Sequence, residues 1–549
     1  GIAGIVPVFG PRLEAAIHLS SLAVNVSQAG VDGCKLLSIL LPHFHNPLAS
    51  KSPALTEADF KLITSDAQTI VSALSGAMDE AMQLQPGDVA FDARLPGLLT
   101  GFQAKIPMLR PLLADANQLL PSLPALLGVG SPVNYLVEIL DATEIRPAGG
   151  FIGNYGILTI EGGHPLPLHI TDVDLLDIPF KHTGRSIGYP PADSWFSRYL
   201  SHYSWSLHDS NLEADFPTAA RAGEYTYQRE GGAIPLQGVI AITPVLIEQV
   251  FAITGPIYVP EYKETITAQN LISRIHFHQL GPAGEGPDYL PSPDGHSSER
   301  KRFTELLGEH LLARLQQLPS DTTAKFLQLL VTSIQDKVVQ AYFNDQSAEH
   351  VLQTLHLDGA IQSPPGDHLV VVDANVSPNK ANSFIVDTVH DQVTIDEHGN
   401  ATHVTTITYA WTLAGQNYGS SIYRDYARVF VPSNASLTSQ NGWQPYGTST
   451  AYGDQVWSGY FTLTYGQTHT ITLQWSSDGA ATRNAQGWHY QYLLQRQAGI
   501  QRTLDLQVML PSCATATSGA GGFVSGGHHI ATLAEAWNED VNASLTYTC

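Results

Sequence analysis

Glu144-Ile145-Arg146-Pro147-Ala148-Gly149-Gly150-Phe151-Ile152-Gly153-Asn154-Tyr155-Gly156 lies between two apolar runs, residues 135–140 and 157–160, that are typical of buried strands. Four glycines and a proline disfavour helix here and allow positive φ. Glycine also lets the backbone approach a neighbour closely, and Arg146 stands at the entrance of the loop. The pattern predicts either an anion-binding or close-packing turn at a strand end, or a tight structural turn with a solvated arginine. The glycine spacing is not the dinucleotide fingerprint and no helix pattern follows, which excludes a nucleotide site.

Outward from this stretch, the chain divides into three parts. Residues 129–362 alternate strand and helix signals, which predicts an α/β domain. Its expected strands are residues 135–140, 157–160, 168–173, 239–242 and 257–259, and its expected helices are residues 219–228, 244–252, 298–318 and 323–342. Residues 1–128 predict a helical module and residues 363–549 an antiparallel β-sandwich with a hairpin turn at 396–400. The expected fold class is therefore multidomain α+β.

The helical module is expected to serve packing or spacing. Residues 55–82 carry apolar side chains at helical spacing, and Thr56 and Glu57 lie near the expected cap. Pro107, Pro111, Pro121 and Pro124 are expected to divide the last part into short pieces. No obvious polar site occurs in this module.

Composition limits the classes of partner. The chain has 549 residues, of which 43% are hydrophobic and only 14% are charged, against about 25% in typical globular proteins. Lys and Arg number 27 and Asp and Glu 50, a net charge of −23. Such a surface repels nucleic acid and anionic lipid, so neither is an expected partner. No apolar run is long enough to span a membrane, and because residue 1 is glycine rather than methionine we expect no signal peptide within these residues.

Cysteines and sequons add expectations that depend on export. If the protein is exported, Cys513 and Cys549 are the natural disulfide pair because both fall in the β-rich part. Cys34, in an apolar helical pattern, is expected to be a buried thiol. Asn-x-Ser/Thr triplets that could carry glycans are Asn25, Asn400, Asn434 and Asn542; Pro378 follows a fifth triplet at Asn375.

Five blocks, in order, resemble the bacterial domain-of-unknown-function family 4012, whose members have extracellular or envelope-facing regions. The blocks are residues 145–155, residues 209–218, Val372-Asp373-Ala374-Asn375-Val376 with Asn379-Lys380, residues 423–432 and residues 492–499. The resemblance implies an extracellular or cell-surface location. It also implies that a membrane helix precedes the region matching residues 1–44, so we expect a processed ectodomain. The family name implies no activity.

Residues 131–318 also resemble, more distantly, the LytR-CpsA-Psr phosphotransferases, which transfer glycopolymers from polyprenyl pyrophosphate to the cell wall. This resemblance implies that Arg146, Arg300 and Arg302 bind pyrophosphate, and that Asp209 or Asp215 holds Mg²⁺. One departure is that residues 172–177 read Asp-Val-Asp-Leu-Leu-Asp where those enzymes carry an arginine–aspartate step. The competing interpretation is that Asp209 and Asn211 fix a turn or cap the helix expected to start near residue 219.

An aromatic cluster and three histidine pairs are further candidates for binding sites. An aromatic cluster could stack on sugars, meet a partner subunit or pack in the core; it comprises Trp195, Phe196, Tyr199, Tyr203 and Trp205. The pairs His43/His45, His276/His278 and His528/His529 supply too few ligands for a structural zinc site. The Gly-x-Ser-x-Gly motif of serine hydrolases is absent.

We predict an extracellular, non-catalytic cell-surface structural protein of bacterial type, without a cofactor. It is expected to assemble with copies of itself into a filament, sheath or layer. The alternative is an envelope glycopolymer phosphotransferase of LytR-CpsA-Psr type that uses Mg²⁺. That alternative requires Arg146, Arg300 and a carboxylate to converge around a cavity.

Overall fold

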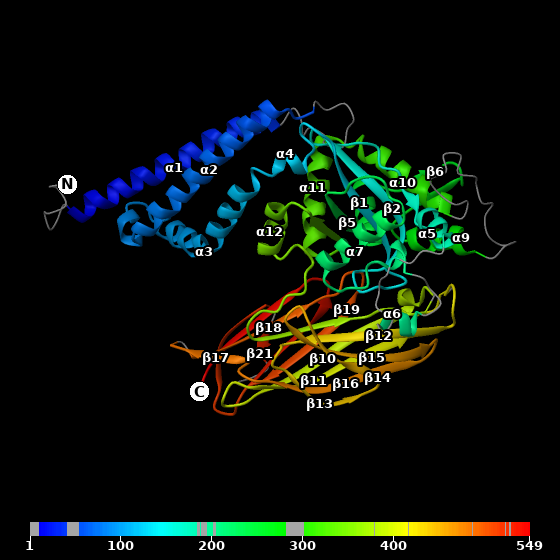
Figure 1. Cartoon of the computed structure of the whole chain (residues 1–549). Helices are drawn as coiled ribbons and strands as arrows, with labels where there is room; N and C mark the ends of the chain where they lie inside the picture. Colours follow the sequence, from blue (N-terminus) through cyan, green and yellow to red (C-terminus); the bar gives the residue numbers. More distant parts are fainter. Residues whose placement is uncertain are drawn as a thin grey trace.

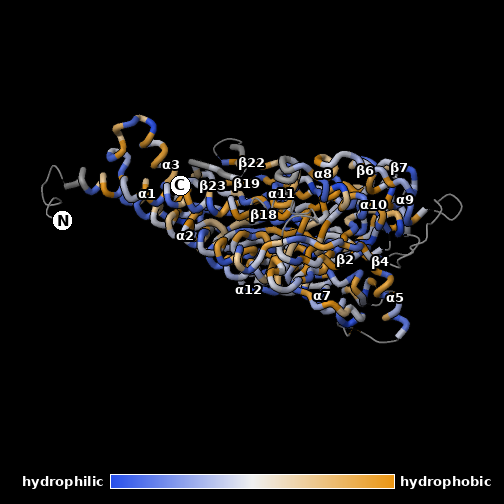
Figure 2. Tube along the Cα trace, turned by 90° about the horizontal axis from the view of Figure 1, so that it is seen from above, coloured by the Kyte–Doolittle hydropathy of each residue, from blue (hydrophilic) through white to orange (hydrophobic). Residues whose placement is uncertain are grey.

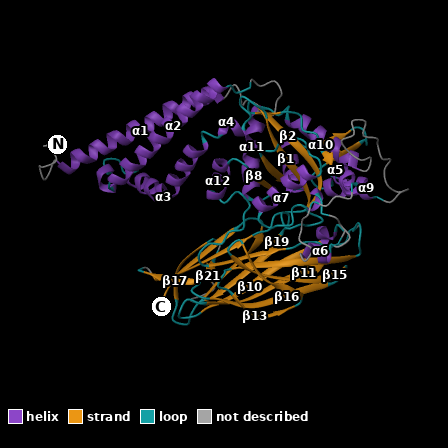
Figure 3. Cartoon of the chain, viewed as in Figure 1, coloured by secondary structure: helices purple, strands orange, loops and turns teal. Residues whose placement is uncertain are grey.

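The protein is described by a computed structural model covering residues 10–40, 54–183, 187, 195–200, 205–281, 301–377, 379–415, 417–485, 487–521, 523–525 and 529–549. It has an N-terminal helical arm (residues 10–126), a central mixed α/β region (residues 133–354) and a C-terminal two-sheet region (residues 367–549) (Figure 1). The arm extends from the central region, and the two-sheet region lies beneath that region (Figure 3). The mixed α/β class, with helices first and largely antiparallel strands last, is as predicted.

The arm is built from two long antiparallel helices and a third that folds back. Its elements are α1 (Gly10–Leu40), α2 (Glu57–Gln83), the 3-10 turn η2 (Pro86–Val89), α3 (Leu95–Leu119) and α4 (Leu123–Leu126). The predicted start of α2 is confirmed, because Thr56 and Asp59 form a reciprocal capping box. The prediction that prolines divide the last part is wrong for α3, which runs through Pro107 and Pro111. No helix in the described ranges is apolar and long enough to cross a membrane.

The central region is a sheet with helices on both faces. Its strands are β1 (Val133–Asp141), β2 (Phe151–Glu161), β3 (His164–Pro165), β4 (Thr171–Asp172), β5 (Gly238–Ile242) and β8 (Val339–Phe343). The order is β3-β2-β1-β5-β8, with β4 on β2, and β1 pairs with β5 in parallel while the other pairs are antiparallel. A small hairpin, β6 (Ile257–Val259) with β7 (Glu264–Ile266), stands apart from this sheet.

Strand alternation explains why both faces of this sheet are covered. In β5, Val239 and Ala241 pack toward α7, whereas Ile240 and Ile242 pack toward α8, α10 and α11. The described helices are α5 (Asp174–His182), α6 (Trp195–Tyr199), η3 (Leu207–Asp209), α7 (Phe216–Arg229), α8 (Pro244–Thr254), α9 (Leu271–Leu280), α10 (Arg302–Leu315), α11 (Ser320–Gln335) and α12 (Gln346–Thr354). Three predictions differ from this structure. Residues 168–173, expected to be one strand, yield only the short β4. Residues 151–156, expected to be loop, belong to β2, and residues 339–342, expected to end a helix, form β8.

The two-sheet region contains two sheets that share one apolar core. The first follows the order β13-β16-β11-β10-β19-β22-β21, and the second β14-β15-β12-β9-β18-β23-β20 with β17 on β18. Their bounds are β9 (Asp367–Val372), β10 (Ile385–Ile395), β11 (Ala401–Trp411), β12 (Ile422–Val431), β13 (Ser436–Asn441), β14 (Gln444–Ala451), β15 (Asp454–Thr464), β16 (Thr468–Ser477), β17 (Ala481–Asn484), β18 (Gly487–Gln495), β19 (Arg502–Met509), β20 (Thr515–Ala520), β21 (Val524–Ser525), β22 (Ile530–Trp537) and β23 (Val541–Thr548). A short turn, η5 (Ala381–Phe384), precedes β10.

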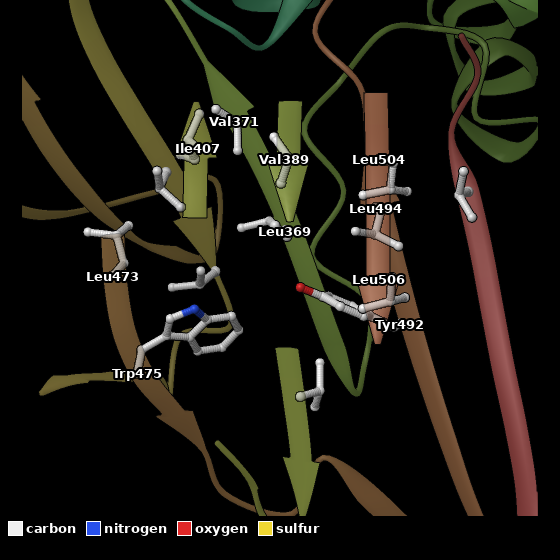
Figure 4. Packing of buried hydrophobic residues seen from close by; sticks show 14 of the residues in the cluster. Leu369, Val371, Val389, Ile407, Leu473, Trp475, Tyr492, Leu494, Leu504 and Leu506 are labelled. Atoms are coloured by element: carbon white, nitrogen blue, oxygen red, sulfur yellow. The ribbon is translucent and has the colours of Figure 1, made fainter. Parts of the chain in front are cut away.

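Most of these strand pairs are antiparallel, as predicted, but β10–β19 and β9–β18 are parallel. Alternate residues of the long central strands, such as β10 and β11, point inward, and Figure 4 shows Leu369, Val389, Trp475 and Leu504 meeting between the sheets. The predicted turn at 396–400 joins β10 to β11. The predicted disulfide between Cys513 and Cys549 is present and ties the last residue to the segment before β20.

Candidate functional site

The glycine-rich loop, residues 142–150, joins β1 to β2 where the central sheet meets the two-sheet region. Gly150 has φ +146°, and a Cβ there would lie 2.6 Å from the carbonyl carbon of Asp141. On the opposing loop, Gly499 has φ +79°, and a Cβ would lie 2.1 Å from the carbonyl oxygen of Gly149. These positions therefore require glycine for close backbone packing. Of the two alternatives for this loop, the structure shows the close-packed turn, but its arginine is buried rather than solvated.

Arg146 is the centre of a buried ion network, and only 3% of it is exposed. Its Nε donates to Oδ1 of Asp209 at 2.8 Å and its Nη2 to Oε1 of Glu144 at 2.9 Å. Its Nη1 donates to the carbonyl oxygen of Asn375 at 2.9 Å and to that of Ile145 at 3.2 Å. Every nitrogen of the guanidinium thus meets a protein oxygen. A phosphate group could reach it only by displacing these partners.

Beyond Asp209, a chain of titratable groups continues into the central region. Nε2 of His208 lies 3.3 Å from Oδ2 of Asp209, and its Nδ1 contacts Asp177. Burial alone would lower the pKa of His208, but Asp209 and Asp177 outweigh burial and raise the pKa to about 9. Burial opposes the lowered pKa of Asp209, which the positive charges of Arg146 and His208 hold well below its usual range. The pair Arg146–Asp209 and the imidazolium of His208 are therefore charged at neutral pH.

This series of buried titratable groups ends at a pair of carboxyl groups, Asp177 and Glu230. Burial, and then the charge of Asp177, raise the pKa of Glu230 to about 9. Oε1 of Glu230 and Oδ1 of Asp177 are both buried without a conventional donor, so a proton on Glu230 can satisfy both oxygens. Glu230 is accordingly the neutral member of the pair at pH 7.

On the other side of Arg146, the network crosses toward η5 and the start of β10. Glu144 accepts from Nζ of Lys380 at 2.8 Å, and Lys380 also lies 3.0 Å from Oδ2 of Asp141. Asp141 in turn accepts from Thr143, whose hydroxyl lies 3.1 Å from Nε2 of His276. Burial alone would raise the pKa of Asp141, but the charge of Lys380 and a hydrogen bond with His276 hold that pKa well below its usual range. This side of the network is a second set of paired charges.

Within the two-sheet region, Gln497 and Asp373 complete the junction. Nε2 of Gln497 donates to the carbonyl oxygens of Asp373 at 2.8 Å and Arg146 at 3.2 Å. The side chain of Asp373 accepts from Tyr409 at 2.8 Å and pairs with Arg502. Burial raises the pKa of Asp425 well above its usual range, and Asp373 adds to the effect. Polar groups from both regions thus form one continuous buried network.

Among the other predicted catalytic and metal residues that the structure describes, Asp215 and Arg302 have partners other than Arg146. Asp215 caps α7: its Oδ2 accepts from the amide of Thr218 at 3.1 Å and its Oδ1 from that of Ile361 at 3.2 Å. Arg302 pairs with Glu305 on α10. Arg300 lies outside the described residues. Within the described ranges, no three His, Cys, Asp or Glu side chains cluster as metal ligands would.

Asn211 fixes the turn, as the competing interpretation proposed, since its Nδ2 donates to the carbonyl oxygen of Gly150 at 2.6 Å. The Asp172–Asp177 stretch is divided: Asp172 binds Lys301, and Asp177 belongs to the His208 chain. His276 and His278 are buried and hydrogen-bonded, whereas His43, His45 and His528 lie outside the described residues.

The aromatic cluster forms a second contact between the two regions. Trp195 stacks on Tyr426 at 4.7 Å between ring centroids, and Tyr199 stacks on Tyr460 at 4.6 Å. Phe196 and Trp205 meet edge to face beneath them. Tyr203 lies outside the described residues. Of the alternatives for this cluster, the structure shows core packing.

The sequon residues and Cys34 take varied positions. Asn434 and Asn542 are exposed, Asn25 and Asn400 are half-buried, and Asn375 is fully buried. The side chain of Asn400 donates to Asp396 at 2.9 Å within the hairpin turn. The prediction that Cys34 is buried is wrong, because the thiol lies on the outward face of α1 and is exposed.

The buried network around Arg146, where the central region meets the two-sheet region (the junction), has little space for a ligand. A cavity lined by residues of the two regions measures about 10 Å³, about the space of one water molecule. Pro147, Lys337, Gln340, Arg496 and Gln497 are among its lining residues. Charges enclosed in this way fix the relative position of the two regions rather than present themselves to a ligand. The sequence did not predict that His208, Asp177 and Glu144 belong to this network. Lys380, Asp373 and Gln497 lie in the blocks that carry the family resemblance, but no role was predicted for them.

Comparison with known proteins supports one part of the family resemblance. A family model described as "Protein of unknown function (DUF4012)" matches residues 131–277. That segment contains β1, the glycine-rich loop and Asp209. No curated protein matches the chain.

Two solved structures illustrate the distant structural likenesses. One is a candidate nutrient binding protein from Legionella pneumophila, 12% identical with a TM-score of 0.22 over 33% of this chain and 71% of that one. The other is an M1 zinc metallopeptidase from Deinococcus radiodurans, 12% identical with a TM-score of 0.18 over 30% of this chain and 42% of that one. The chain therefore spans less than half of the metallopeptidase. Likenesses at these values have no bearing on function.

Proposed function

We propose that the protein is an extracellular, non-catalytic structural component of a bacterial cell surface, and that it acts as a subunit of an assembly such as a filament, sheath or layer. The observation that carries this proposal is the enclosure of Arg146. The cation best placed to hold a phosphorylated substrate is instead bonded to Asp209, Glu144 and two carbonyl oxygens. A closed network of this kind suits a rigid building block.

Two further features support association as the mode of action. The arm exposes large apolar side chains on α1, α2 and α3 and between them; Val24, Leu62, Met82, Phe91, Leu98 and Met108 are each more than half exposed. Figure 2 shows apolar positions along the arm, where it extends beyond the body. Exposed apolar surface of this extent is typical of sites that meet other proteins. The disulfide supports an oxidising compartment, because such bonds persist outside the cytosol.

The phosphotransferase alternative finds less support. It needs Arg146, an Asp and Mg²⁺ around a shared cavity, whereas Asp209 and Asp215 bind different partners and the junction cavity holds about one water. The similarity of the central region to LytR-CpsA-Psr phosphotransferases therefore stays a prediction.

The test is the state of the purified chain in solution. Analytical ultracentrifugation from micromolar to near-millimolar concentration, with negative-stain microscopy of the concentrated sample, is expected to show self-association. A strictly monomeric chain over the whole range would contradict the proposal. Transfer of a glycan from a polyprenyl-pyrophosphate carrier, lost in Asp209→Asn, would support the alternative instead.

A further inference from the structure

We propose that the outward face of α1 binds α1 of a second copy, in an antiparallel helix pair. The proposal rests on the function proposed above and identifies the surface and the partner. Ile17, Val24 and Val31 follow one another at seven-residue intervals and are 55%, 64% and 54% exposed. Seven-residue spacing places apolar side chains on one stripe of a helix, the pattern of helices that pair along their length.

The opposite face of α1 is already occupied. Leu19 and Leu22 pack on the core of the arm, and Leu36, Ile39 and Leu40 pack on the cluster around Phe60. α1 therefore has apolar residues on two faces, of which α2 covers one. A helix that is apolar on both faces is normally covered on both. In Figure 1, α1 lies at the outer edge of the arm, away from the two-sheet region.

Small residues alternate with the large ones on the free face. Ser20, Ser27 and Cys34 are exposed and also recur every seven residues, offset by three from Ile17, Val24 and Val31. A shallow groove runs along the second half of this face, lined by Ser27, Gly30, Val31, Cys34, Lys35 and Ser38. Small side chains allow another helix to approach closely. The face thus offers large side chains next to gaps of the size that would receive them.

This alternation selects the antiparallel orientation and a second copy as the occupant. In an antiparallel pair of identical helices, Ile17 faces Cys34, Ser20 faces Val31 and Val24 faces Ser27, so each large residue meets a small one. In a parallel pair, large would meet large and small would meet small, which leaves uneven gaps. The same sequence is therefore complementary to itself when one copy is reversed.

Charge supports the same orientation. Along the outward face no charged side chain lies between Glu14 and Lys35 in the described residues. Lys35 keeps an ion pair with Asp32 at 2.8 Å but remains 58% exposed. The antiparallel pair brings Glu14 of one copy toward Lys35 of the other, whereas a parallel pair would place like charges opposite one another.

The size of the face sets the strength of the pair. A helix of 31 residues is about 46 Å long and about 10 Å wide, so two such faces bury on the order of 900 Å² in total. Stable interfaces bury about 1,200–2,000 Å². We therefore expect a dimer that dissociates on dilution.

Cross-linking tests the orientation. One chain carries Ile17→Cys in a Cys34→Ser background, and the other is the wild type, which retains Cys34. Under mild oxidation, the antiparallel pair predicts a disulfide-linked heterodimer in the mixture and none in either chain alone. Cross-links within each single chain and none between them would show a parallel pair and overturn the proposal.

Sedimentation tests the surface. Val24→Glu places a charge in the centre of the face and is expected to weaken the dimer by at least about tenfold. Val26→Glu is the matched control, because Val26 is 52% exposed and lies two residues from Val24, about half a turn around the helix and off the stripe of Ile17, Val24 and Val31. Unfolding midpoints should be unchanged in both variants, since both side chains are exposed.

If both variants associate like the wild type, α1 is not the interface, yet assembly through another surface would leave the proposed function intact. If the wild type is monomeric throughout, both proposals fail. Binding of the wild type, but not of Val24→Glu, to phosphatidylcholine vesicles without dimerisation would assign the face to lipid and overturn the inference.

Discussion

At the scale of single residues, Arg146 illustrates how a buried charge is tolerated. Moving a guanidinium from water into the interior is unfavourable by several kcal/mol. Four oxygens from three chain segments offset that cost, two of them on carboxylates. The net contribution of such a group to stability is small, but removing one partner leaves the others buried and unpaired.

We expect Arg146→Ala to lower the free energy of unfolding by about 3–5 kcal/mol, because Asp209 and Glu144 would lose their cation in a dry environment. Arg94→Ala is the control: Arg94 pairs with Asp92 at 2.9 Å but is 84% exposed, so no measurable loss is expected. Urea denaturation of both variants measures the difference. Equal losses would show that the Arg146 network is not a stability determinant.

The buried titratable groups around His208 predict that the free energy of unfolding falls as the pH rises. The folded pKa of His208, about 9, lies above its unfolded value, so its contribution is complete below pH 6.5 and is lost as pH passes 9. Glu230, also about 9 when folded, holds its proton far above its unfolded pKa and acts in the same direction. The urea midpoint should therefore be lower at pH 9.5 than at pH 6. Glu230→Gln should reduce this difference, and His398→Gln, at an exposed position, should not.

At the scale of elements, the glycine-rich loop links β1, β2 and the loop after β18 through backbone contact. Gly150→Ala is expected to destabilise by about 1–3 kcal/mol, since a Cβ at φ +146° would press on Asp141. Gly153→Ala in the same stretch should change stability by less than about 1 kcal/mol, because no atom lies within 4 Å of its Cβ position. Thermal unfolding of the pair tests this. A larger loss at Gly153 would contradict the packing argument.

Elements with local signals could be predicted from the sequence, and those set by distant contacts could not. The start of α2 follows from Thr56 and Asp59, which are three residues apart. The strand β8 was expected to continue a helix, but Lys337 adopts φ +52° and ends α11, and pairing with β5 then organises β8. A positive φ at lysine requires tertiary support that no local pattern reports.

The same limit applies to the site. Arg146 was singled out by its place in the loop, but its partners Asp209 and Asn375 lie 63 and 229 residues away. A single sequence gives no measure of such distances. A cap on the helix near residue 219 was expected because a cap is a local interaction, but it was assigned to Asp209 or Asn211, whereas the structure gives it to Asp215.

At the scale of the molecule, the buried network joins the central and two-sheet regions into one body. By contrast, α1 belongs to the arm and packs there on α2. Amides of the loop, including Ala148 and Phe151, are bonded to Asn211 and Glu144. We expect hydrogen exchange in residues 142–151 to be as slow as in β11, and exchange in α1 to be faster in dilute samples. Mass spectrometry of peptides from the three segments measures this. Loop exchange as fast as that of α1 would show that the two regions separate readily.

The bond between Cys513 and Cys549 has a mechanical consequence. Tension applied at residue 549 would pass through the sulfurs directly to residue 513. The strands β20, β21, β22 and β23 lie between those residues and would carry none of the load until the covalent bridge was reduced. Force would instead enter the body through β19, which is hydrogen-bonded along its length to β10 on one side and β22 on the other. In oxidising surroundings, a load applied at residue 549 therefore bypasses β23.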